Sequence, residues 1–345
     1  MEVLMEKLLT VVVPSYNVEK YLEETLESFV IPEIMDDLEV LIVNDGSKDR
    51  TPEIGAAYEK RYPQTFRLIS KENGGHGSVI NFAAKIAVGK YMKILDADDW
   101  VIADNMTELL QYLAHTTSDV VITNFDMVDA EGRFRQPFEI EGVEFKRNYS
   151  MDELATLPEC VYACSTFHGI FYRTEFYQKM NIRVSERVFY EDQEYATLPF
   201  YGVSSVSFLN LTIYQYLVGR PGQSVSHENQ VKRLPEIKHI LDNLIRFYQA
   251  HSEMSEARKK YFRYKIGVVI LSYYVAALLK NPNRKQGRND AAALRAELRQ
   301  NSHELMLLTE KKYWIARCLH TIHMTPDGLE RIKRTHFYYI LKKFI

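Results

Sequence analysis

Cysteine is scarce in this sequence. Three cysteines stand among 345 residues, and their number is odd. A chain of this length can bury a stable core without disulfides, so we expect reduced thiols in a cytoplasm. Cys160 and Cys164 are four residues apart, without a further cysteine or a close histidine, so we expect burial rather than zinc binding.

Glycine, proline and long apolar runs are also few. The 15 glycines and 11 prolines exclude a fibrous or low-complexity protein. No stretch approaches the roughly 18 uninterrupted apolar residues of a membrane span. The first apolar run, 10–13, is too short for an export signal, so we expect none. With 46% hydrophobic and 26% charged residues, the composition is that of a globular protein, either soluble or peripheral to a membrane.

Charge is unevenly distributed, although the net charge is only −3. Residues 230–345 contain 23 lysines and arginines against 10 aspartates and glutamates, so the rest of the chain is strongly acidic. This asymmetry predicts two regions, 1–229 and 230–345, with different partners. In the second region, the apolar residues of 236–250 have helical spacing. The apolar run at 266–279 is too short to cross a bilayer, so we expect both stretches to form buried helices. Their basic residues either cover solvated helix faces or meet an anionic partner.

The first hundred residues repeat a pattern of apolar strand, polar loop and helix. Four strands are expected, over 9–13, 38–43, 66–69 and 91–95. Continuous apolar strands that alternate with helices predict a mainly parallel sheet covered on both faces. A fifth strand is expected over 119–125, followed by a hairpin with its turn at 129–132. Because ligands collect at the carboxyl ends of such strands, the four polar loops should form one crevice.

Two acidic groups stand out. Asp96, Asp98 and Asp99 follow the fourth strand, and carboxylates so close together repel one another unless a cation compensates them. Oxygen ligands without cysteine or histidine favour Mg²⁺ or Mn²⁺. The alternative is a solvated acidic turn that caps the next helix. The second group, Glu191 and Asp192, follows hydrophobic residues and precedes a helical stretch.

Four motifs in this order resemble the family 2 glycosyltransferases with a GT-A fold. They are VVPSYN at 12–17, VNDGS at 43–47, NGG at 73–75 and DADD at 96–99. The resemblance covers roughly residues 8–225. It implies a Rossmann-like α/β fold, a mainly parallel sheet flanked by helices, to which the α-helical C-terminal extension is added. It also implies an inverting, metal-dependent sugar transfer. Family members often have Asp where Asn44 stands, a mild departure.

The resemblance assigns residues to the donor nucleotide. Asp45 would accept a hydrogen bond from uracil, and the glycine-rich loop would approach the phosphates. Arg220 would clamp the diphosphate, and His76 either touches the donor sugar or caps a helix. The nucleotide-binding set is Pro14, Ser15, Tyr16, Asn17, Asp45, Asn73, Gly74, Gly75, Asp96, Ala97, Asp98 and Arg220.

The resemblance also implies a general base and metal ligands. Asp192 would deprotonate the acceptor hydroxyl, and Glu191 either orients it or is itself the base. Asp98 and Asp99 are candidate ligands of Mn²⁺ or Mg²⁺, with Asp98 alternatively on the ribose. His227 either adds a nitrogen ligand or is a surface histidine.

The expected donor is a UDP-sugar, and the expected acceptor is a cell-surface glycan or its lipid-linked precursor, with no nucleic-acid partner. We expect a cytoplasmic protein at the inner face of the membrane. Its residues 330–345 would contact an anionic bilayer, pack on the catalytic domain or form a homodimer. A sugar nucleotidyltransferase is disfavoured because no glycine- and lysine-rich phosphate loop follows Val13. A catalytically silent binding module of the same fold is the other alternative, against which the intact acidic motifs argue.

Overall fold

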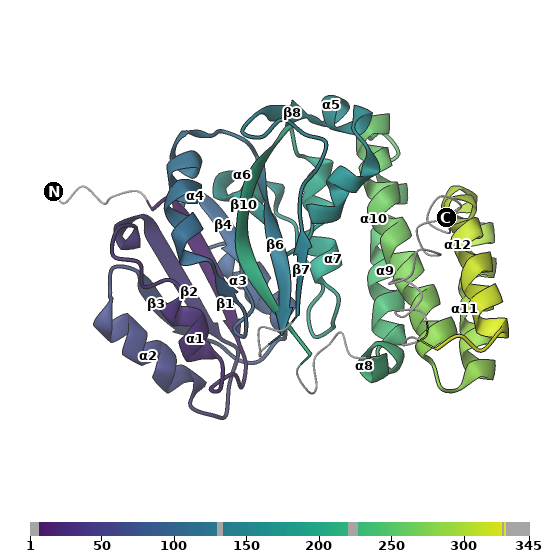
Figure 1. Cartoon of the computed structure of the whole chain (residues 1–345), viewed down its shortest axis with the longest axis horizontal. Helices are drawn as coiled ribbons and strands as arrows, with labels where there is room; N and C mark the ends of the chain where they lie inside the picture. The colour runs from purple at the N-terminus through teal and green to yellow at the C-terminus, as the bar shows by residue number, and fades with distance from the viewer. Residues whose placement is uncertain (1–6, 130–133, 220–226, 326–327, 329–345) are drawn as a thin grey trace. The chain divides into compact units, whose positions relative to one another are not determined.

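The computed structural model describes residues 7–129, 134–219, 227–325 and 328, and the chain forms two compact units (Figure 1). The first unit comprises Met1–Arg220 with Met254–Tyr261, and the second Pro221–Glu253 with Phe262–Ile345. The predicted division after residue 229 falls within helix α8 (His227–Lys232) of the second unit. That division stays a prediction.

The parallel half of the sheet contains the first four strands. They are β1 (Leu9–Ser15), β2 (Leu38–Asn44), β3 (Phe66–Ser70) and β4 (Tyr91–Ile94). Each pairs in parallel, in the order β3-β2-β1-β4, and every residue of β1, β2 and β4 is buried. Burial on both faces explains why these strands are continuously apolar rather than alternating. The predicted parallel arrangement is confirmed here.

The other half of the sheet is mixed. Beyond β4 the order continues β9-β6-β10-β5, with β7 beside β6 and β8 beside β10. The bounds are β5 (Trp100–Val101), β6 (Val120–Asp129), β7 (Arg135–Phe138), β8 (Asn148–Ser150), β9 (Ile170–Arg173) and β10 (Ser205–Val218). Strands β6 and β10 are parallel, whereas β9 is antiparallel to both β4 and β6. The β6–β7 hairpin is as predicted, and most of its turn lies outside the described residues.

Helices follow the strands of the first unit (Figure 1). The α-helices are α1 (Leu22–Glu27), α2 (Thr51–Arg61), α3 (His76–Ala83), α4 (Ala103–His115), α5 (Met151–Thr156), α6 (Thr174–Met180) and α7 (Asp192–Tyr195). Short 3₁₀ turns are η1 (Met35–Asp37), η2 (Glu159–Cys164) and η3 (Leu198–Tyr201). Thr51 is the first residue of α2, and its N–H donates to Asp49 Oδ1 at 3.0 Å.

The second unit is helical, as predicted for the C-terminal region. Its elements are α8, α9 (Leu234–Ala250), the later part of α10 (Glu256–Val275), the π-helical turn η4 (Ala276–Lys280), α11 (Arg284–Asn301) and α12 (His303–Thr321). In α9, Ile237, Ile240, Leu241 and Leu244 are buried, as an apolar stripe of helical period requires. Asn283 caps α11 by accepting the N–H of Gln286 at 3.0 Å. The basic residues Arg284, Lys285 and Arg288 therefore lie on this helix.

One described helix meets the length and composition expected of a membrane span. It runs from Glu256 to Lys280, through α10 and η4, and 67% of its most apolar stretch is buried inside the protein. Burial of this kind is also usual for the core helix of a globular protein. The prediction of a buried helix over 266–279 therefore agrees with its packing.

Candidate active site

A pocket of about 380 Å³ lies at the carboxyl ends of the parallel strands. It brings six of the predicted nucleotide-binding residues together with a segment from much later in the chain. The lining residues are Pro14, Ser15, Tyr16, Asp45, Asn73, Gly75, His76, Val79, Arg187, Val188 and Phe189. Tyr16 is 51% exposed and Phe189 is 45% exposed, so both rings offer apolar faces to a bound base or sugar.

Asn17 connects two loops of this site instead of lining the pocket. Its backbone is left-handed, with φ of +53°, a conformation that asparagine tolerates better than most residues. Its N–H donates to Ser47 Oγ at 3.0 Å, and its Oδ1 accepts the N–H of Lys48 at 2.8 Å. Asn44 Oδ1 accepts the N–H of Ser47 at 2.9 Å. These bonds hold the loops after β1 and β2 together.

Asp45 organises the glycine-rich loop. Its buried carboxylate accepts the N–H groups of Gly74, at 3.0 Å, and Gly75, at 2.8 Å. Lys71 Nζ donates to the same carboxylate at 2.6 Å, and Asn73 Nδ2 donates to the Asp45 carbonyl at 2.9 Å. The predicted uracil ligand therefore also shapes the loop that was expected near the phosphates. Sequence reasoning missed Lys71, because no motif includes it.

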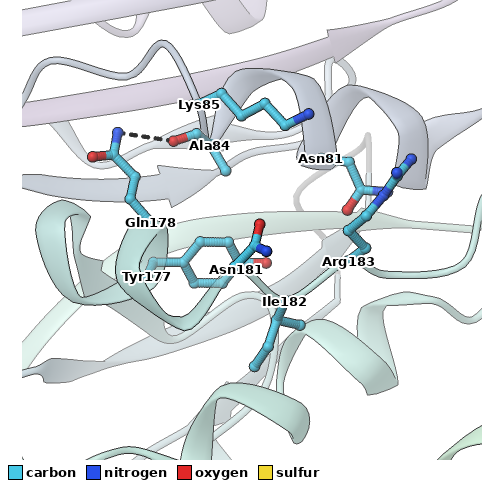
Figure 2. A pocket seen from close by; sticks show the side chains of 8 residues that line it. All are labelled: Asn81, Ala84, Lys85, Tyr177, Gln178, Asn181, Ile182 and Arg183. Carbon is cyan, nitrogen blue, oxygen red and sulfur yellow. Dashed lines mark hydrogen bonds between the residues drawn. The ribbon is translucent and has the colours of Figure 1, made fainter.

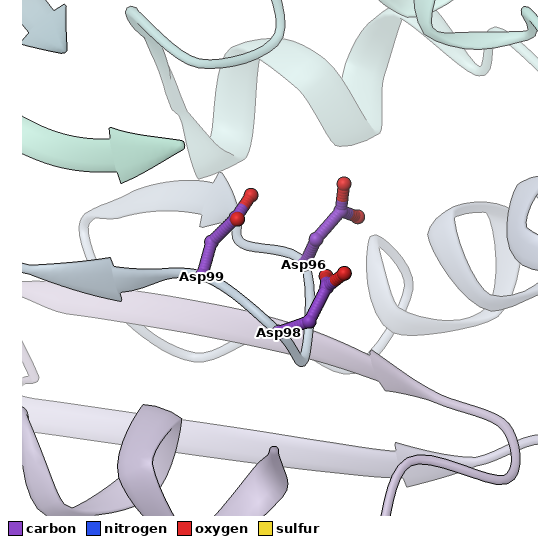
Figure 3. Close-up of side chains that lie close together, drawn as sticks. All are labelled: Asp96, Asp98 and Asp99. Carbon is purple, nitrogen blue, oxygen red and sulfur yellow. The ribbon is translucent and has the colours of Figure 1, made fainter. Parts of the chain in front are cut away.

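Three carboxylates converge on the loop between β4 and β5. Figure 3 shows Asp96, Asp98 and Asp99 projecting from this loop toward the same side, and one oxygen of each lies within 4.8 Å of the others. Asp99 is 1% exposed, while Asp96 and Asp98 are partly exposed. Three oxygen ligands at this spacing, two of them accessible, fit a hard divalent cation. The three aspartates of the predicted metal site therefore lie together, and their role as ligands stays a prediction. Ala97 lies buried within the same loop.

Asp99 also holds the loop to strand β10. Tyr214 donates its hydroxyl to Asp99 Oδ2 at 2.5 Å, and the N–H of Leu217 donates to Oδ1 at 2.8 Å. Burial, followed by repulsion from Asp96, raises the pKa of Asp99 well above its ordinary value. Its two oxygens thus already have protein donors, whereas Asp98 is the more accessible carboxylate. Asp98 is therefore the stronger candidate of the two predicted ligands.

A buried lysine lies near this cluster. Lys93, on β4, is 1% exposed, and its Nζ donates to the His168 carbonyl at 2.6 Å. The same ammonium lies 4.6 Å from the ring centre of Phe171 and 4.9 Å from that of Tyr214. Burial lowers the pKa of Lys93 to about 7, although Asp96 and Asp99 favour its charged form. In its charged form Lys93 thus offsets part of the negative charge of Asp96 and Asp99.

His76 links the two acidic groups. Its Nδ1 lies 2.5 Å from Glu191 Oε1, and its Nε2 lies 3.1 Å from Asp96 Oδ1. Burial alone would lower the pKa of His76, but hydrogen bonds to Asp96 and Glu191 outweigh it and raise the pKa well above 6.5. The sequence left its role open between the donor sugar and a helix cap. The structure places it between the two acidic motifs.

Asp192 is the first residue of α7. It is partly buried, and its Oδ2 accepts the side-chain amide of Gln193 at 2.8 Å. The segment before it is tied to the glycine-rich loop, since Arg187 donates its N–H to the Gly74 carbonyl at 3.1 Å and its Nη2 to the Asn73 carbonyl at 2.9 Å. This contact brings the Glu191-Asp192 pair close to the pocket that Tyr16 and Asp45 line.

A second pocket, of about 280 Å³, lies between α3 and α6. Figure 2 shows Asn81 and Arg183 on one side of it, and Tyr177 and Gln178 on the other. The Asn81 amide donates to the Val184 carbonyl and accepts the Val184 N–H, both at 2.9 Å. These bonds fix the start of the segment that continues to Arg187. The pocket therefore lies next to the segment that precedes Glu191 and Asp192 in the candidate active site.

Two further predicted ligands stay untested. Arg220 lies outside the described residues, so its place at the diphosphate stays a prediction. His227 opens helix α8 of the second unit, where its side chain is exposed. Its role as a metal ligand likewise stays a prediction.

Comparison with known proteins identifies the relatives of this chain. Residues 10–178 match the model of glycosyl transferase family 2. The uncharacterized glycosyltransferase EpsJ of Bacillus subtilis (strain 168) is 28% identical over 248 residues, which are 71% of this chain and 69% of EpsJ. The sequence likeness thus continues beyond the matched domain.

Solved structures show the same fold. S. aureus TarS (residues 1–349), in complex with UDP, has a TM-score of 0.52 and 20% identity, over 92% of this chain and 90% of that one. The mannosyltransferase PcManGT from Pyrobaculum calidifontis, in complex with GDP-mannose and Mn²⁺, has a TM-score of 0.55 and 17% identity, over 91% and 86%. At these identities the likeness concerns the fold alone, and it confirms the expected GT-A architecture.

Proposed function

We propose that this glycosyltransferase, whose residues 10–178 belong to glycosyl transferase family 2, moves a sugar from a UDP-sugar to an acceptor hydroxyl with inversion at the anomeric carbon. The observation that carries the proposal is the set of contacts made by one side chain, His76. His76 lines the nucleotide pocket, and its ring touches both Asp96 and Glu191. A donor site, a carboxylate cluster for phosphates and a candidate base motif therefore meet in one place.

The donor is held by the loops after the first three strands. Asp45, supported by Lys71, offers carboxylate oxygens at the pocket wall, where a uracil N–H could donate. The structural neighbours bind UDP in one case and GDP-mannose in the other. A carboxylate can accept an N–H from uracil or from guanine, and the resemblance of the four sequence motifs is what favours uracil in this chain. The diphosphate would extend toward Asp96 and Asp98.

Groups of this site account for each bond that forms or breaks in the transfer step. The acceptor hydroxyl gives its proton to the Asp192 carboxylate as its oxygen attacks the anomeric carbon, on the face opposite the diphosphate. The bond from the anomeric carbon to the phosphate oxygen breaks, and its electron pair leaves with UDP. The carboxylates of Asp98 and Asp99 would hold Mn²⁺ or Mg²⁺. Such an ion supplies positive charge beside the departing diphosphate.

The test of this function is release of UDP from a panel of UDP-sugars, with GDP-mannose as the control donor and Mn²⁺ present. We expect release from at least one UDP-sugar and none from GDP-mannose. Binding of UDP-sugars without release, even with acceptor glycans present, would favour the silent binding module. Formation of a sugar nucleotide from a sugar phosphate and UTP would favour the nucleotidyltransferase.

The acceptor is proposed to be a cell-surface glycan or its lipid-linked precursor, and the protein is proposed to act at the inner face of the membrane. Helix α12 exposes three large apolar side chains, Leu307, Leu308 and Trp314 at 58, 46 and 51%, beside Lys311 and Lys312. Exposed leucine and tryptophan next to lysine suit the interface of an anionic bilayer. The predicted contact of residues 330–345 lies outside the described residues, and a homodimer stays an expectation.

Vesicle flotation tests the membrane contact. We expect the full chain to float with phosphatidylglycerol vesicles and not with phosphatidylcholine vesicles. Truncation after residue 329 removes five basic residues, each worth about 1 kcal/mol near an anionic surface, and should reduce binding at least tenfold. Equal binding by the truncated chain would exclude the tail as the anchor. The remaining candidate would be α12, which the double substitution Leu307→Gln and Trp314→Gln then tests.

A further inference from the structure

One imidazole joins two acidic motifs that are far apart in the sequence. His76 contacts Glu191 at 2.5 Å through Nδ1 and Asp96 at 3.1 Å through Nε2. The Glu191 side chain is 6% exposed, and the Asp96 side chain 36%. Asp96 belongs to the donor side of the site, and Glu191 precedes Asp192, the candidate base. The imidazole therefore spans the two sides of the proposed reaction.

The first turn of α3 is built to bring His76 against Glu191. Gly77 follows His76, and a Cβ at that position would lie 2.0 Å from the Ser185 carbonyl oxygen and 3.1 Å from Glu191 Cγ. Only a residue without a side chain allows so close an approach. The backbone of α3 and the segment before Glu191 are thus in direct contact, and the carboxylate is confined next to the ring.

The backbone that leads to Asp192 adopts a conformation that its residues disfavour. Arg187 has φ of +58° and Tyr190 has φ of +71°. An arginine and a tyrosine in the left-handed region persist only where the surroundings determine the conformation. Contacts of Arg187 with the glycine-rich loop determine one end of this segment. The hydrogen bond between Glu191 and His76 lies at the other end of the segment, where it can determine the backbone conformation.

We propose that His76 is a positioning residue, which holds Glu191 in a bridge to Asp96 and thereby places Asp192 opposite the donor as the base. This inference rests on the proposed glycosyl transfer. It also assigns Glu191 an orienting role and not that of the base, because its carboxylate is buried and bonded to the ring. Neither assignment is visible in the sequence, where 115 residues separate His76 from Glu191.

Three substitutions of His76 separate its two contacts. His76→Leu removes both, His76→Asn keeps a donor near the position of Nδ1, and His76→Gln keeps one near the position of Nε2. We expect His76→Leu to lower kcat for transfer about 100-fold, the cost of a base misplaced by about 1 Å. Because His76 also lines the pocket, the Kd for UDP should rise as well, but by a much smaller factor than kcat falls. His76→Asn should retain more activity than His76→Gln, because the Glu191 contact is the one that matters.

His115→Asn is the matched control, since His115 is exposed at the end of α4, and it should transfer at the native rate. In a Glu191→Gln background, His76→Leu should cause little further loss, because His76 acts through Glu191. Native kcat in His76→Leu would overturn the proposal. So would a variant series in which UDP affinity falls by the same factor as kcat and Tm falls with them, since a purely structural role would produce that result.

The two proposals fail in different ways. If the native chain releases UDP from no UDP-sugar, the proposed function fails, and the His76 series has no activity to compare. If the native chain transfers sugar and His76→Gln is fully active while His76→Asn is as slow as His76→Leu, the function stands. The positioning role through Glu191 is then wrong.

Discussion

Asp192→Asn should bind UDP as tightly as the native chain while losing sugar transfer by a factor of about 10² to 10⁴, the usual contribution of a general base. The substitution keeps the shape of the side chain and the start of α7, but an amide cannot take the acceptor proton. Donor binding should survive, because Asp192 is not among the residues that line the nucleotide pocket. Transfer is measured from UDP release with acceptor present, and affinity by calorimetry with UDP.

Asp152→Asn is the control for this substitution. Asp152 is an exposed aspartate in the first turn of α5, so it matches Asp192 in residue type and in its place at a helix start. It should transfer at the native rate. If Asp192→Asn also transfers at the native rate, the assignment of the base to Asp192 is wrong, and Glu191→Gln becomes the next variant to measure.

Asp98→Ala should abolish metal-dependent transfer, with a loss of at least about 10³-fold. Asp98 is the more accessible of the two predicted metal ligands, and its loss leaves a site in which Asp99 is already bonded to Tyr214 and Leu217. The charge stabilisation that a bound ion gives to a leaving phosphate amounts to several kcal/mol. UDP release is measured across a Mn²⁺ titration, with and without EDTA.

The native chain should lose activity in EDTA and regain it with Mn²⁺, whereas Asp98→Ala should stay inactive at every Mn²⁺ concentration. Asp104→Ala, at an exposed position in the first turn of α4, should behave as the native chain does. Equal activity of the native chain with Mn²⁺ and with EDTA would contradict the metal dependence, whatever the effect of the substitution.

The parallel half of the fold could be predicted because its residues carry a simple signal. The continuous apolar runs that become β1 and β2 have no polar face, so they require cover on both sides. Once these strands are parallel, the loops that follow them must meet at one edge. The convergence of Ser15, Asp45 and Asn73 in one pocket is a direct consequence of that topology.

The mixed half of the sheet was harder to predict from the sequence. Strand β9 is only four residues long, and it lies antiparallel between β4 and β6. Its short apolar run, from Ile170 to Tyr172, resembles many other buried segments. Such pairings are decided by tertiary contacts and not by a local pattern.

The supporting residues of the site could not be predicted, because their function depends on distant partners. Lys93 is one polar residue within an apolar strand, and its place near Asp96 and Asp99 follows from the packing of the 167–171 segment. Lys71 is an ordinary loop lysine until its contact with Asp45 is seen. Likewise, the sequence offered Asp98 and Asp99 as equal ligands, and the burial of Asp99 and its bonds to Tyr214 and Leu217 became visible only in the structure.

The central claim is that the carboxylates of residues 96–99 hold a divalent cation against the diphosphate of the donor. The most direct measurement is the anomalous scattering of manganese in crystals of the native chain soaked with UDP and Mn²⁺. The account predicts a manganese peak that Asp98 would hold beside the diphosphate of UDP. Bound UDP in the pocket without manganese beside these aspartates would contradict it.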